Sequence, residues 1–166
     1  VDVNGKITNW KAYCLSGGMS ATVYLNNHQD NSIIQKLHSL LNDLCEEGIY
    51  GISKVFTKEE AIQQERYGGD FSFVLETDGY TAFGDSAVRP LVSHFDTTDY
   101  RYGYATHGYL PDKGAQPILL AKGPDICENV TLENGLVVDE APTFAKILGV
   151  DLPHAEGSAI NEILKA

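Results

Sequence analysis

The spacing of apolar residues changes twice in the first half of the chain, and this change restricts the fold more than any other feature. Asp30 or Asn31 can cap a helix that Gly48 can end. Shorter runs on either side, 21–25 and 52–56, have the composition of strands. The pattern predicts an amphipathic helix that covers the face of a sheet. The apolar residues at helical spacing are Ile33, Ile34, Leu37, Leu40, Leu41, Leu44 and Cys45.

The following segments extend this pattern. Thr57-Lys58-Glu59-Glu60 matches a capping box, so a second helix is expected to run to about Tyr67. Residues 71–75 read as a further strand, and Asp78-Gly79 predicts a hairpin turn onto another strand over 80–83. We therefore expect residues of about 20–85 to form a compact α+β unit with its helices on one face of the sheet.

The second half of the chain has a different composition. Residues 87–114 are rich in Pro, Gly, His, Asp and Tyr, which predicts a long loop. Strands are expected at 117–121 and 136–138, then a helix that Gly149 ends, with Phe144, Ile147 and Leu148 facing inward, and a last helix over 158–165. The apolar run 117–121 suits burial on both faces of a parallel sheet. If no parallel sheet surrounds this strand, we expect it to lie at an exposed edge, to pair with another copy of the chain, or to be covered by rearranged segments.

Charge and composition exclude several classes of protein. The net charge of -11 repels a phosphate backbone, so we expect no nucleic-acid partner. No apolar run approaches the roughly 18 residues of a membrane helix, and the first residues resemble no signal peptide. The start at Val1 suggests a piece of a longer protein. Cys14, Cys45 and Cys127 form no CxxC pair, which favours reduced thiols and a cytoplasmic location.

The densest group of chemically useful residues lies in the long loop. His94, Asp96, Asp99, His107 and Asp112 are residue types that bind zinc, although the two histidines lie thirteen positions apart and not in a compact motif. Their alternative role is that of surface or hydrogen-bonding residues. Likewise, Arg89 and Arg101 could hold a phosphate or be solvated. Ser16-Gly17-Gly18 precedes a strand, so a plain turn is favoured over a phosphate loop.

Three segments of the second half occur in the order typical of one enzyme family: 106–112 (THGYLPD), 117–124 (PILLAKGP) and 138–149 (VDEAPTFAKILG). In these segments the chain resembles the type I phosphodiesterase/nucleotide pyrophosphatases of the alkaline phosphatase superfamily. The first half, most of all 54–61 (KVFTKEEA), is similar to the cap that such enzymes insert. The resemblance implies an α/β fold, with an α+β cap-like half over 1–88 and carboxy-terminal segments of an alkaline-phosphatase-like core over 89–166.

The resemblance also implies a site. Family members hold two zinc ions with aspartates and histidines, and by that pattern His107 is a metal ligand. The nucleophile motif and the Asp-His-Gly motif of the family have no counterpart in this chain, so no catalytic residue is assigned. We expect an inactive carboxy-terminal fragment of a zinc phosphodiesterase, with little affinity for zinc alone. Its partners are then the missing amino-terminal half and, in the parent enzyme, a small phosphorylated substrate.

Two other functions stay open. The chain could be a free-standing ligand-binding or interaction domain in which the α+β half is the working part. It could also be a complete small metalloenzyme with His94, Asp96, Asp99 and His107 as ligands, although one loop would then need rigid support for all four.

Overall fold

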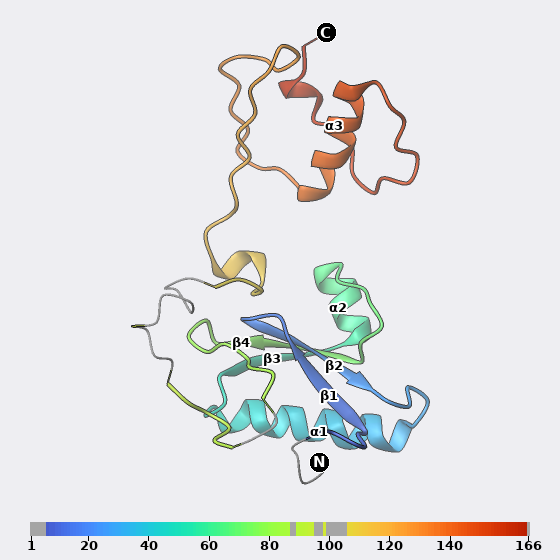
Figure 1. Ribbon diagram of the computed structural model, residues 1–166, viewed down its shortest axis with the longest axis vertical. Coiled ribbons are helices and arrows are strands. Elements are labelled where there is room, and N and C mark those ends of the chain that lie inside the picture. The colour runs from blue at the N-terminus through green and yellow to red at the C-terminus, as the bar shows by residue number, and fades with distance from the viewer. Residues whose placement is uncertain (1–5, 87–88, 95–97, 99–105, 166) are drawn as a thin grey trace. The chain divides into compact units, whose positions relative to one another are not determined.

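The computed structural model describes residues 6–86, 89–94, 98 and 106–165, and the chain divides into two compact units, Val1–Gln116 and Pro117–Ala166 (Figure 1). Helices and an antiparallel sheet occur together, which confirms the predicted α+β character. Residues 106–116 belong to the first unit here. The predicted boundary after residue 88 concerns a parent enzyme and stays a prediction.

A four-stranded antiparallel sheet forms the first unit, in the order β1-β2-β4-β3. Its strands are β1 (Ala12–Ser16), β2 (Ser20–Leu25), β3 (Ile52–Thr57) and β4 (Phe73–Thr77). β2 and β4 are central, with Ala21 opposite Leu75 and Val23 opposite Phe73. β1 is not evident in the sequence, because its middle residues Tyr13, Cys14 and Leu15 are all exposed on an edge strand. The turn predicted at Ser16-Gly17-Gly18 joins β1 to β2, as expected.

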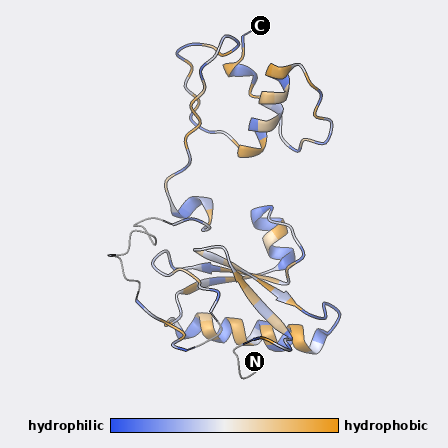
Figure 2. Cartoon of the chain, in the orientation of Figure 1, coloured by the Kyte–Doolittle hydropathy of each residue, from blue (hydrophilic) through white to orange (hydrophobic). Residues whose placement is uncertain are grey.

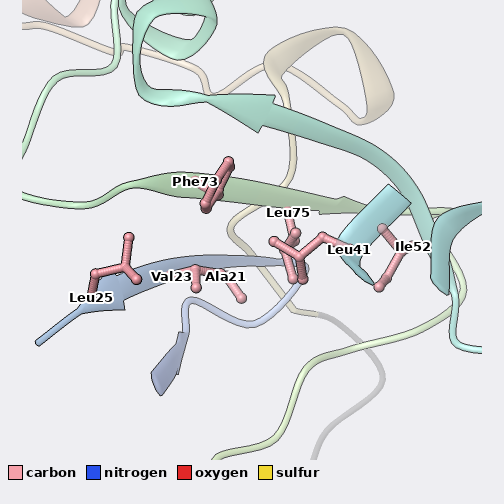
Figure 3. Close-up of a cluster of buried hydrophobic side chains, with 7 residues drawn as sticks. All are labelled: Ala21, Val23, Leu25, Leu41, Ile52, Phe73 and Leu75. Carbon is pink, nitrogen blue, oxygen red and sulfur yellow. The ribbon is translucent and has the colours of Figure 1, made fainter. Parts of the chain in front are cut away.

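One face of the sheet is covered by helix α1 (Asn31–Glu47). The Asp30 carboxylate accepts a hydrogen bond of 3.1 Å from the Ile33 backbone N–H, and Gly48 ends the helix at φ 69°, so both predicted ends are confirmed. Apolar and polar residues alternate along α1 in Figure 2, as an amphipathic helix requires. The buried side chains beneath it form the main core (Figure 3): Ala21, Val23, Leu25, Leu41, Ile52, Phe73 and Leu75.

The opposite face is covered in part by helix α2 (Lys58–Glu65). Phe56, Ala61, Phe71 and Val74 form a second buried cluster there. Successive strand residues point to opposite faces, so Val74 lies across the sheet from the core that contains Phe73. The prediction of helices on one face is therefore wrong (Figure 1). The reason is that every residue of β4 is buried, so both of its faces need cover.

The hairpin predicted at Asp78-Gly79 is not formed, and 81–86 is not a strand. The Asp78 carboxylate instead accepts hydrogen bonds of 2.9 Å from the backbone N–H groups of Tyr80 and Thr81, which turns the chain away from β4. The Phe83 N–H then bonds the Gly18 carbonyl at 2.8 Å. A local side-chain bond has replaced the expected strand pairing.

The second unit contains helix α3 (Glu140–Leu148) and two short 3₁₀ turns, η2 (Val137–Asp139) and η3 (Asn161–Ile163). α3 begins and ends where predicted, with Gly149 at φ 66°. Strands expected at 117–121 and 136–138 are absent, and of the last helix expected over 158–165 only the three residues of η3 are helical. An apolar run becomes a strand only beside a partner, and within 117–165 the only strand pairing is the bridge between Ile126 and Leu164.

The buried face of α3 also differs from the prediction. Thr143 and Ala145 are buried, whereas Phe144 is 48% and Leu148 74% exposed, and Ile147 is only partly covered. The Thr143 hydroxyl accepts a 2.8 Å bond from the Ile160 N–H and donates to the Asp139 carbonyl at 2.6 Å. The described part of this unit therefore covers Thr143 and Ala145 and leaves the larger apolar side chains of the helix exposed.

Among the described residues, no helix is both long and apolar enough to cross a membrane.

The capping box of α2 gives a first test. Thr57→Ala removes the hydroxyl that accepts a 3.2 Å bond from the Glu60 N–H, and it should lower the free energy of unfolding by about 1 kcal/mol in urea denaturation. Thr57→Ser keeps the hydroxyl and should change the free energy of unfolding little.

The same capping box should make this stability depend on pH. Hydrogen bonds from the Thr57 backbone N–H and then from its hydroxyl lower the pKa of Glu60. The stabilisation from Glu60 should therefore be present at neutral pH and be lost as the pH falls through the lowered pKa of its carboxyl. An equal loss of stability from both substitutions would contradict this account.

Candidate functional site

Two glycine turns that lie far apart in the sequence meet in the first unit. The Met19 N–H donates a 2.9 Å hydrogen bond to the His107 carbonyl. Gly18 and Gly108 have φ angles of 88° and 93°. A Cβ atom on Gly108 would lie 1.9 Å from the Gly17 carbonyl oxygen, and one on Gly18 would lie 2.6 Å from that of His107. The two backbones touch directly, so only glycine fits at either position.

A buried ion pair holds the next residues of the same segment. Glu76 on β4 is 2% exposed, and its carboxylate lies 3.3 Å from the Lys113 ammonium. The same carboxylate accepts a 2.9 Å bond from the Leu110 N–H. Lys113 also donates to the Ser53 hydroxyl at 2.9 Å and to the Thr77 carbonyl. These bonds fix residues 110–113, including the 3₁₀ turn η1 (Pro111–Lys113), against β3 and β4.

An open hollow of about 450 Å³ lies on the face of the sheet that carries α2. It is bounded by the end of α2, by β2, β3 and β4, and by the segment 107–111. Most of its surface is apolar or aromatic, which is usual for a ligand pocket. Its lining residues are Gly17, Ser20, Phe56, Ala61, Glu65, Tyr67, Val74, Glu76, His107, Gly108, Tyr109, Leu110 and Pro111.

Of the candidate metal ligands that the structure describes, His107 is the one that borders this hollow. His107 is exposed, and its imidazole has no hydrogen bond to the described part of the chain. Asp112 lies exposed in η1, and His94 and Arg89 are also exposed. Asp96, Asp99 and Arg101 lie outside the described residues, so the four-ligand site and the paired-arginine phosphate site stay predictions.

Metal ligands are not gathered elsewhere in the ranges that the structure describes: no three His, Cys, Asp or Glu side chains there are placed to hold an ion. His107 therefore stands alone as a predicted ligand within these ranges. A catalytic zinc normally has three protein ligands, so the others would have to come from residues outside this description.

Glu76 and Lys113 are functional-site residues that the sequence did not identify. The available sign was the charge of Glu76 directly after the apolar run 73–75, because a buried carboxylate requires a partner. Nothing in the sequence identified that partner as Lys113, which lies in the segment predicted to be a loop.

No family model, curated protein or solved structure matches this chain. The family resemblance therefore rests on the sequence motifs alone.

The ion pair gives a second test. Lys113→Met leaves the Glu76 carboxylate buried without its cation, and it should lower the free energy of unfolding by about 2 kcal/mol. Adding Glu76→Gln should recover part of that loss, because a neutral amide costs less to bury. Lys36→Met, at an exposed position of α1, is the matched control. Equal losses for Lys113→Met and Lys36→Met in urea denaturation would show that the pair does not stabilise the unit.

Proposed function

We propose that this chain is the carboxy-terminal part of a zinc-dependent phosphodiesterase or nucleotide pyrophosphatase, and that His107 is one of its metal ligands. The observation that carries the proposal is the placement of His107. Its carbonyl is held by the Met19 N–H, the glycines beside it allow close backbone contact, and its ring is exposed at the edge of a hollow. A fixed backbone and an available ring nitrogen are both required of a metal ligand.

The chemistry of the imidazole fits zinc. His107 makes no hydrogen bond to described residues, so a ring nitrogen is free to donate to a metal ion. When bound, two zinc ions would supply activation of a hydroxyl and stabilisation of a leaving oxygen in the attack on phosphorus. The contribution of this chain is one positioned nitrogen. The remaining ligands and the nucleophile would come from the amino-terminal half of the parent enzyme.

The second unit supports the same proposal. Its apolar side chains are largely uncovered, with Ile118 84% and Leu120 90% exposed. Contiguous apolar surface of this kind usually marks an interface. It is expected of segments that complete the core of a larger protein, and we place that protein in the cytoplasm from the scattered cysteines.

A second candidate function is that of a free-standing ligand-binding domain. The observation in its favour is that the hollow is lined wholly by residues of the first unit, which has its own buried core. Such a domain would bind its ligand without zinc and without any further chain. The two candidates differ in their response to metal.

The proposal predicts weak metal binding by the chain itself. Calorimetric titration with zinc should show no stoichiometric site of micromolar or tighter affinity, because one histidine replaces the usual three ligands. Bis(4-nitrophenyl) phosphate should not be hydrolysed. Tight zinc binding together with turnover that His107→Ala abolishes would show a complete enzyme and overturn the fragment proposal.

The test of the function itself uses the longest reading frame that contains this chain. That protein should hydrolyse the same diester with zinc, and His107→Ala should lower kcat/KM by about 100-fold, which corresponds to about 3 kcal/mol of transition-state stabilisation. Excess zinc should restore part of the activity if the lost group is a ligand. His28→Ala, at an exposed position of the first unit, should have no effect. Zinc-independent activity, or equal effects of both substitutions, would refute the role of His107.

A further inference from the structure

We infer that the hollow of the first unit is a binding site for a small organic ammonium ion with apolar or aromatic substituents. The inference does not rest on the proposed hydrolase activity, because the residues that carry it, Glu65, Tyr67 and Tyr109, are not proposed to hold zinc.

The charges around the hollow favour a cation. Among the described residues, its lining contains two carboxylates, Glu65 and Glu76, and neither Lys nor Arg. Glu76 is compensated by Lys113 at 3.3 Å and by the Leu110 N–H. Glu65 is a partly buried residue, and its carboxylate has no hydrogen bond or ion pair to any described residue. No buried side-chain oxygen of the described chain lacks a partner, so this carboxylate reaches solvent, where it can act as the counter-ion of a positively charged ligand in the hollow.

The position of Glu65 in its helix adds to the negative potential. Glu65 is the last residue of α2, and the last turn contains no basic residue. The carbonyl end of a helix carries a partial negative charge, and a cation is usually placed there. In α2 an acidic residue occupies this end instead. The helix terminus and the carboxylate together attract a cation into the hollow.

The aromatic lining distinguishes an organic ammonium ion from a bare metal ion. Phe56 and Val74 are buried beneath the hollow, and Tyr67 and Tyr109 also line it. Aromatic faces attract ammonium groups, and apolar walls cover alkyl substituents. A hard metal ion would instead need several oxygen ligands around it. The combination of aromatic faces and one carboxylate is therefore suited to a substituted ammonium group.

The neighbouring basic residues, Lys54 and Arg66, are not the counter-ion of Glu65. The Lys54 ammonium donates to Gln64 at 3.1 Å and lies 4.0 Å from the centre of the Phe56 ring, but Lys54 does not line the hollow. Arg66 caps the end of α2 with its backbone and is also absent from the lining. The Lys54 ammonium already occupies the Phe56 ring, so the cation of the ligand would lie against Tyr67 or Tyr109 and beside Glu65.

The experiment compares two probes of the same shape and different charge. The chain is titrated with 4-hydroxyphenyltrimethylammonium and with its neutral analogue 4-tert-butylphenol, and binding is followed by NMR chemical shifts of the amides of 107–111. The charged probe should bind at least about 10-fold more tightly, since cation–π and carboxylate contacts together give about 1.4 kcal/mol.

Glu65→Gln keeps the size of the side chain and should abolish this 10-fold preference while leaving the amide spectrum of the sheet unchanged. Glu59→Gln makes the same change of net charge at an exposed position of α2 that does not line the hollow, and it should retain the preference. The inference is wrong if neither probe shifts these amides, if both probes bind equally to the unaltered chain, or if Glu59→Gln removes the preference as fully as Glu65→Gln does.

Discussion

The burial of β4 on both faces is the constraint on which the first unit depends. All five residues from Phe73 to Thr77 are buried, so the strand cannot lie on an open sheet. α1 covers the side of Phe73 and Leu75, whereas α2 and the segment 107–111 share the other side. Incomplete cover on that second side leaves the hollow.

Burial of Glu76 has a further effect. A carboxylate at this depth must be paired, and Lys113 with the Leu110 N–H satisfies it. These two interactions satisfy the carboxylate on β4, and they also hold residues 106–113 beside the sheet. The position of His107 depends on them and on the contact between the two glycine turns. The residues that pair with the buried Glu76 thus also position the candidate site.

Local signals in the sequence were sufficient for much of the fold. The spacing of apolar residues predicted α1, and the capping box predicted α2, because both depend on residues within one or two turns. β1 was missed because an exposed edge strand need not alternate, and 117–121 was assigned wrongly as a strand because its apolar run gives no information about a partner. The predictions of His107 and zinc came from family resemblance. The hollow could not be predicted at all, since its walls come from positions between 17 and 111 that only the tertiary fold brings together.

The contact between Gly18 and Gly108 joins segments that lie far apart in the sequence. It closes a loop of about ninety residues with a backbone hydrogen bond and no side-chain interlock. Closing a loop of this length costs chain entropy, which this contact offsets together with the pairing of Lys113 and Glu76. The main core beneath α1 contains no residue of 106–113. Detachment of that segment would therefore open the hollow and leave this core covered.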